Sequence, residues 1–211
     1  LPLHIFGIFL NITQSGQIAS MLSLFIKIIG IIFALHVLIL LLQYTIAGIV
    51  TRRNPFKLLY TMLPAYFTAL GTQSSAATIP VTLKQTLSNK VNPDVADFVI
   101  PLCATIHLSG STLKIVACAI ALMLMHGDAV VASDMIYFIC MLGVVMVAAP
   151  GVPGGAIMAS ISVLQSILGF NEAQIALMIA LYITMDNFGT ACNVTGDGAL
   201  ALIIDKMYQK R

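Results

Sequence analysis

The sequence predicts an all-α membrane protein, and three observations support this fold class. Of the 211 residues, 59% are hydrophobic and only 9% are charged, whereas soluble domains have about 25% charged residues. The run from Ile28 to Val50 contains no Asp, Glu, Lys or Arg, and it is longer than the ~20 residues that a membrane-spanning helix needs. The sequence also lacks the segments of ~10 alternating apolar and polar residues that build a membrane β-barrel. We therefore expect helices that cross the lipid bilayer.

The distribution of charge predicts which loops face the cytoplasm. Lys and Arg cluster at residues 52–57, 84–90 and 206–211, whereas the polar breaks at 126–134 and 169–174 contain neither. Cytoplasmic loops of membrane proteins are enriched in Lys and Arg. We therefore expect the three basic clusters inside the cell and the two acidic breaks outside.

The segments between these loops follow in order. Residues 15–50 form a long helix that ends at the first basic cluster. Residues 55–87 begin and end in basic sequence, and their middle, "GTQSSAATIP", is small and polar, which predicts a re-entrant hairpin. Non-helical backbone at membrane depth is tolerated only where it is buried in protein or lines a cavity. Residues 97–125 must then cross outward, and "TIHLSGST" interrupts them.

The second half repeats this order from the opposite side of the membrane. Residues 135–168 begin and end outside, and the Pro and Gly residues of "AAPGVPGG" predict a second re-entrant hairpin. Residues 171–206 then cross inward. The sequence thus predicts an inverted repeat of a hairpin followed by an interrupted helix, which is typical of secondary transporters with a binding site near the bilayer midplane.

Three parts are expected along the chain. Residues 1–54 hold the end of one transmembrane helix and a long transmembrane helix, residues 55–125 hold the first hairpin and its interrupted helix, and residues 126–211 hold the second hairpin and the last helix. The chain starts at Leu1 in apolar sequence, and we interpret it as the C-terminal part of a longer protein.

A polar stripe runs along the last apolar segment, residues 185–204. Asp186, Thr190, Asn193 and Asp197 are spaced i, i+4, i+7 and i+11, and at 100° per residue these positions fall within about 60° of arc. A carboxylate in a membrane helix costs at least ~2.5 kcal/mol. The two aspartates therefore need cationic partners.

Three strings in these segments, "QSSAATIPVT", "PGVPGGAIM" and "DNFGTACNVTGD", resemble the dicarboxylate/amino acid:cation symporters, the glutamate-transporter family. The resemblance extends over essentially the whole chain. It implies the transport core of that family, from the last third of helix five through helix six, hairpin one, helix seven, hairpin two and helix eight. The implied activity is symport of an amino acid with a cation, sodium or else a proton, by elevator-type alternating access. It implies a multi-pass protein of the cell membrane that is a homotrimer at full length, with no enzymatic cofactor and no nucleic-acid partner.

The resemblance also implies the residues of the site. Asp186 would bind the substrate's α-amino group with the help of Thr190, Asn193 would hold its α-carboxylate, and Asp197 would bind sodium. The implied substrate contacts are Gln73, Ser74, Ser75, Gly151, Val152, Pro153, Gly154, Asp186, Gly189, Thr190 and Asn193. The implied cation ligands are Cys103, Thr105, His107, Ala149, Asn193 and Asp197.

Two positions depart from the pattern for acidic substrates. Gly189 stands where members specific for acidic substrates have Arg, and Gln73 stands where Arg often precedes the serines. An Arg pairs bidentately with a carboxylate, and neither residue can. Lys114 is expected to be a structural partner or a snorkelling side chain. The alternative is that Lys114, or an Arg from elsewhere in the chain, replaces the missing guanidinium, although Lys114 lies about 10 Å beyond His107 along an ideal helix. The sequence therefore predicts a neutral amino acid as substrate; the alternative is a dicarboxylate or acidic amino acid.

The helix-seven motif departs as well. The family's Asn-Met-Asp-Gly-Thr reads His107, Leu108, Ser109, Gly110 and Ser111 here. Ser109 removes an aspartate that ligates sodium, and His107 could be a ligand or a titrating group. Sodium and proton coupling therefore both stay open.

Two other classes of protein compete with a transporter. An intramembrane aspartyl protease needs two carboxylates ~3 Å apart, but Asp186 and Asp197 lie ~16 Å apart along one helix axis. A passive channel needs a continuous pore, whereas two re-entrant gates of opposite orientation favour alternating access. We therefore expect a transporter and no enzymatic activity.

Overall fold

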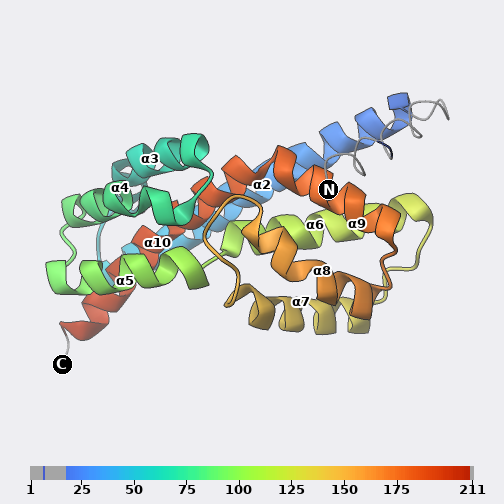
Figure 1. Ribbon diagram of the computed structural model, residues 1–211. Coiled ribbons are helices and arrows are strands. Elements are labelled where there is room, and N and C mark those ends of the chain that lie inside the picture. Colours follow the sequence, from blue (N-terminus) through green and yellow to red (C-terminus); the bar gives the residue numbers. More distant parts are fainter. Residues whose placement is uncertain (1–6, 8–17, 210–211) are drawn as a thin grey trace.

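The computed structural model describes residue 7 and residues 18–209, and this part of the chain is helical without a β-strand (Figure 1). The helices are α2 (Ile18–Thr51), α3 (Pro55–Thr72), α4 (Ser75–Ser88), α5 (Pro93–Ile106), α6 (Ser109–His126), α7 (Ala132–Met146), α8 (Gly155–Leu168), α9 (Glu172–Thr184) and α10 (Asp186–Tyr208). The all-α prediction is confirmed. The expected helix start at Ser15, the preceding helix end, and the basic residues Lys210 and Arg211 lie outside the described residues.

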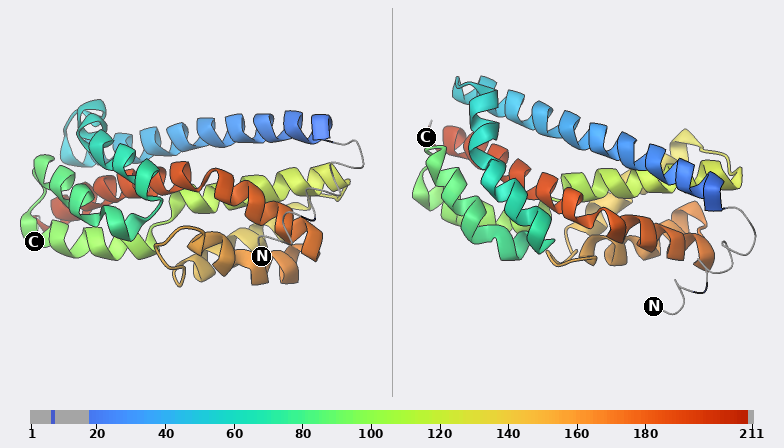
Figure 2. Two further views of the ribbon diagram at one scale, coloured as in Figure 1. Left: turned by 45° about the horizontal axis from the view of Figure 1, so that its top comes forward. Right: turned by 90° about the horizontal axis from the view of Figure 1, so that it is seen from above.

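Several helices are long and apolar enough to cross a membrane. Residues Phe25–Thr51 of α2 meet this criterion, and so does Pro93–His126, which comprises α5 and α6. The pair α9 and α10 meets it as one span that bends by 61°. In both views of Figure 2, α2 runs along the length of the molecule beside α10 and α6. These helices support a multi-pass membrane location.

Two helical hairpins enter the molecule from opposite ends. Figure 1 shows α3 and α4 at one end and α7 and α8 at the other, with the turn of each hairpin near the centre. The hydroxyl of Ser74 in the first turn donates to the carbonyl oxygen of Gly151 in the second, at 2.8 Å. The two tips are therefore in direct contact, although 77 positions separate these residues in the sequence.

Local sequence signals explain the first hairpin. Asn54 caps the start of α3 by accepting from the backbone N–H of Lys57, and Pro55 occupies the first turn, where its missing N–H costs nothing. Gln73 ends α3 in the left-handed conformation, with φ of 53°. Ser74 caps α4 by accepting from the N–H of Ala77 at 3.2 Å. The polar tip is therefore a helix end followed directly by a helix start.

The second tip depends on its Pro and Gly residues. Residues 147–154 join α7 to α8, and Gly154 precedes α8 with φ of 74°, a conformation that favours glycine. Gly151 needs to lack a side chain, because a Cβ atom there would lie 2.8 Å from the carbonyl oxygen of Ala104. The backbone of this tip thus packs tightly against α5.

Two helix breaks lie beside the tips. His107 and Leu108 separate α5 from α6, and Met185 separates α9 from α10. The break before α6 packs closely on α10, since a Cβ atom on Gly110 would lie 2.7 Å from Cβ of Cys192. The helix α10 contacts α2, α3, α4, α5 and α6, so the polar stripe lies at the centre of the fold.

The charged loops are sorted to the two ends of the molecule. The end of α2 and the α4–α5 turn lie at one end in Figure 1, whereas the α6–α7 and α8–α9 connections lie at the other. The guanidinium of Arg53 donates to the carbonyl oxygen of Asn89 across the basic end. At the acidic end, the amide of Gln174 donates to Asp128 at 3.3 Å. This separation is what a cytoplasmic and an external face would require.

Candidate substrate and cation site

A small polar cavity lies where the tips and the breaks converge. Its volume is about 10 Å³, roughly the smallest space that holds one water molecule. A substrate can therefore enter only when one of the tips moves. The lining residues are Gln73, Ser75, Leu108, Ser111, Pro150, Gly151, Val152, Ala156, Tyr182, Asp186, Thr190 and Asn193.

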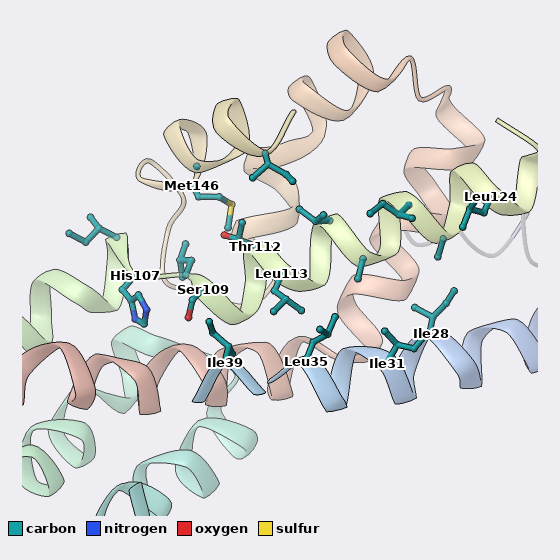
Figure 3. Close-up of a pocket in the computed structure, with 18 residues that line it drawn as sticks. Ile28, Ile31, Leu35, Ile39, His107, Ser109, Thr112, Leu113, Leu124 and Met146 are labelled. Atoms are coloured by element: carbon teal, nitrogen blue, oxygen red, sulfur yellow. The ribbon is translucent and has the colours of Figure 1, made fainter. Parts of the chain in front are cut away.

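A much larger hollow of about 760 Å³ lies between α2, α6 and α7 (Figure 3). Its lining is mostly aliphatic, and the polar side chains of His107, Ser109 and Thr112 lie near one end. A charged substrate would lose its hydration in such a groove and gain few polar contacts. The small polar cavity is therefore the better candidate for the substrate site.

The carboxylate of Asp186 forms two hydrogen bonds within the protein. One oxygen accepts from the backbone N–H of Gly154 at 2.7 Å, so the second tip is bound directly to α10. The other oxygen accepts from Nζ of Lys114 at 3.2 Å. The cationic partner that the sequence requires for Asp186 is thus supplied by α6.

The ammonium group of Lys114 is fully buried and well surrounded. It also donates to the carbonyl oxygen of Tyr182 at 3.3 Å, and it lies 3.3 Å from the centre of the Tyr182 ring. A cation close to an aromatic face is stabilised by the ring quadrupole. The start of α10 thus holds one buried carboxylate and one buried ammonium group.

Lys114 also explains Gly189. A Cβ atom on Gly189 would lie 3.1 Å from Nζ and 3.4 Å from Cε of Lys114, so the lysine fills the space beside this glycine. Lys114 therefore reaches the position that the sequence alternative gave it. Distance along α6 from His107 does not measure distance to α10, which packs against α6. The available signal was the lysine itself, because a charge within a membrane helix needs a partner.

The second carboxylate, Asp197, is also paired within the protein. Its Oδ1 atom lies 2.8 Å from Nδ1 of His107 at the break between α5 and α6. The amide nitrogen of Gln43 on α2 lies 3.2 Å from Nε2 of His107 and donates to Ser109 at 3.3 Å. Three helices therefore meet at Asp197 through one chain of polar contacts.

The structure brings only some of the predicted cation ligands together. His107 and Asp197 are in contact, and the carbonyl oxygen of Cys103 accepts from the N–H of His107 at 2.9 Å. Thr105 is exposed, and its hydroxyl donates to Leu102 of its own helix at 2.9 Å. Ala149 is buried at the second tip. Sodium prefers hard oxygen ligands, so its site near Asp197 stays a prediction.

Asn193 joins α10 to the start of α6. Its Oδ1 accepts from the N–H groups of Gly110 at 2.8 Å and Ser111 at 3.3 Å. Its Nδ2 donates to the hydroxyl of Ser111 at 2.9 Å. No residue at the start of α6 caps that helix with its own side chain, within the part of the chain described. Asn193 therefore acts as the cap from a neighbouring helix, a role that its spacing in the sequence does not reveal.

The remaining predicted contacts differ in their placement. Gln73, Ser75, Val152 and Thr190 line the cavity, whereas Pro153 is exposed and lies outside the lining. Ser111 and Tyr182 were missed as site residues, and Lys114 was considered only as an alternative. All three lie on apolar helices, and the contacts that reveal their roles join residues distant in the sequence.

Substituting Gly151 with alanine should impair closure of the tips. The added Cβ atom would lie 2.8 Å from the carbonyl oxygen of Ala104, a backbone atom that cannot move alone. We expect uptake by the intact protein to fall at least about tenfold, which corresponds to ~1.4 kcal/mol. Gly71→Ala is the matched control, because a Cβ there meets no described atom within 4 Å. Equal uptake by both variants would show that the Gly151 contact is not needed.

Comparison with known proteins identifies the family. The sodium:dicarboxylate symporter family matches residues 1–207. Excitatory amino acid transporter 3 of Mus musculus is 31% identical over 199 residues, which are 93% of this chain and 37% of that protein. Excitatory amino acid transporter 1 of Homo sapiens is 30% identical over 203 residues, 95% of this chain and 37% of that protein.

The chain thus spans a little over a third of the length of these curated relatives. The family match, by contrast, covers nearly all of the chain. The resemblance drawn from the two hairpin strings and the α10 motif is confirmed. The chain belongs to the sodium:dicarboxylate symporter family.

Proposed function

We propose that the protein is a sodium-coupled symporter of a small acidic solute, either an acidic amino acid or a dicarboxylate. The contact between Ser74 and Gly151 carries this proposal. Two hairpins from opposite ends of the fold meet over one polar cavity, and each can act as a gate from its own side. Two gates that share one site are what alternating access requires.

The acidic class is better supported than a neutral amino acid. The neutral prediction assumed that no positive charge lies near Gly189. Lys114 supplies one, because its Nζ lies 3.1 Å from the position of a Gly189 Cβ atom. The relatives at 30–31% identity are named excitatory amino acid transporters, which agrees with a site that receives a second carboxylate.

The finer parts of the proposal concern the two halves of the chain and its assembly. Residues 55–125 and 126–211 would form the inverted halves of the transport core, and residues 1–54 would connect it to the rest of a longer protein. That protein would be a homotrimer, in which the core moves as an elevator. Sodium would bind near Asp197, and a proton is the alternative coupling ion.

Uptake by the intact protein in proteoliposomes tests this function. Accumulation of labelled aspartate, succinate or serine should be measured with an inward sodium gradient, an inward proton gradient or no gradient. We expect an acidic solute to be concentrated above its external level only with the sodium gradient. Downhill equilibration that is independent of any gradient would instead indicate a passive pathway, and preferred accumulation of serine would restore the neutral alternative.

A further inference from the structure

We propose that the ion pair between Asp186 and Lys114 selects the substrate. An acidic amino acid replaces this pair by placing its α-ammonium group on Asp186 and its side-chain carboxylate on Lys114. Lys114 is then the specificity-determining residue, and the substrate class narrows to solutes that carry an α-ammonium group and a side-chain carboxylate in addition to the α-carboxylate. This inference rests on the proposed symport of an acidic solute.

The position of Lys114 carries the first step. The start of α10 has one carboxylate, Asp186, and beside it the side-chain-free position Gly189. The ammonium group of Lys114 lies within reach of both, at 3.2 Å from the carboxylate and 3.1 Å from the Cβ position. The space that Gly189 leaves open therefore holds a positive charge from the neighbouring helix α6.

The surroundings of Lys114 allow it to change partner. The carbonyl oxygen and the aromatic face of Tyr182 both contact its ammonium group, and neither contact depends on Asp186. The ammonium group can therefore stay in place when the carboxylate of Asp186 turns to another cation. A substrate carboxylate would then restore the ion pair on Lys114.

The burial of both charges disfavours solutes that lack either the α-ammonium group or the side-chain carboxylate. Both members of the pair are buried, at 0% and 4% side-chain exposure, and separating such a pair is costly unless each member gains a new partner. A neutral amino acid provides an ammonium group for Asp186, but its single carboxylate is the α-carboxylate, which we expect on Asn193, so Lys114 is left without a partner. A dicarboxylate without an amino group leaves Asp186 without a cation. An acidic amino acid compensates both.

The second tip is coupled to the same exchange. The backbone N–H of Gly154 donates to the second oxygen of Asp186 at 2.7 Å, so the carboxylate joins the tip to Lys114. Opening the tip removes one of the two hydrogen bonds that hold Asp186 in place. The exchange of partners is thus easiest when the gate is open, which is when a substrate can arrive.

Three solutes of nearly equal size test the proposal on the unaltered protein. Aspartate carries both groups, asparagine lacks the side-chain charge, and succinate lacks the ammonium group. We expect unlabelled aspartate to inhibit the sodium-driven uptake of labelled aspartate at least about a hundredfold more strongly than either analogue does. The reason is that several kcal/mol is lost where a buried charge has no partner. Preferred uptake of asparagine or succinate would overturn the exchange. Failure to accumulate any of the three would instead count against symport of an acidic solute.

Variants then test the roles of the two charges. Lys114→Met should lose the preference for aspartate over asparagine, and Asp186→Ser should lose the preference for aspartate over succinate. Lys114→Met combined with Gly189→Arg should regain selectivity for aspartate, because the cation returns to the same space from α10. The matched control is Lys27→Met, which removes an exposed lysine of α2. Unchanged selectivity in Lys114→Met, or no recovery in a folded double variant, would overturn the role of Lys114.

Discussion

Replacing Asp197 with asparagine should abolish the cation dependence of uptake. Asp197 is buried, and asparagine keeps its shape and its ability to accept the hydrogen bond from His107. The amide, however, supplies no negative charge to balance a cation that has lost its hydration, and an uncompensated buried ion costs several kcal/mol. We expect the apparent affinity for sodium to fall at least about a hundredfold at ~1.4 kcal/mol per decade, as measured by the sodium dependence of substrate uptake.

The control for this substitution lies on the same helix. Asp205 is also buried, and its carboxylate accepts from the side chain of Gln209 at 2.9 Å. Asp205→Asn removes an equivalent charge about two turns beyond Asp197 and should leave sodium dependence unchanged. If Asp197→Asn kept the normal affinity for sodium, this result would show that Asp197 is not part of the cation site.

Replacing Gly110 with alanine should destabilise the centre of the fold. The new Cβ atom would lie 2.7 Å from Cβ of Cys192 and 2.8 Å from the carbonyl oxygen of Gly189. The start of α6 would have to move away from α10, although His36 also holds it through a 3.0 Å hydrogen bond to Gly110. Overpacking of this kind costs about 1–3 kcal/mol, so we expect a loss of several degrees in melting temperature in detergent.

The same change in an open position is the control. Gly143 lies within α7, and a Cβ atom there would meet no atom of the described residues within 4 Å. Alanine should be neutral there or stabilising by up to about 1 kcal/mol, because it restricts the unfolded chain and favours helix. Equal melting temperatures for the two variants would show that the helix break beside Gly110 accommodates the added methyl group without strain.

The order of elements could be predicted because each depends on local sequence. Small polar residues, Pro and Gly mark the tips, and an apolar run without charges marks α2. The helix ends were less accurate. The sequence prediction begins this span at Asp97, whereas α5 begins at Pro93 after the capping residue Asn92. A prediction based on apolar residues alone does not detect such a polar cap. The break between α9 and α10 lies at Met185. An apolar residue within an apolar segment gives no sequence signal for a helix break.

The site could be predicted only in part, because its contacts join distant residues. Spacing on one helix showed that Asp186 and Asp197 share a face and need cations. It could not show that Lys114 and His107 supply basic side chains, since these pairs are 72 and 90 positions apart. Helix packing decides such partners. The prediction of a neutral substrate lost its basis when Lys114 was found beside Gly189.

The pairing of Asp186 with Lys114 also has a consequence for membrane voltage. Moving one unit charge across a membrane changes its free energy by ~2.3 kcal/mol per 100 mV. An unpaired carboxylate at Asp186 would therefore make the free energy of moving the empty transport core depend on the membrane voltage. The ion pair carries no net charge, and its displacement should generate little current. In voltage-jump recordings on the intact protein without cations, Asp186 should therefore add little to the charge movement, which leaves Asp197 as the buried carboxylate that moves in the field. Lys114→Met should add a current component from Asp186 under the same conditions.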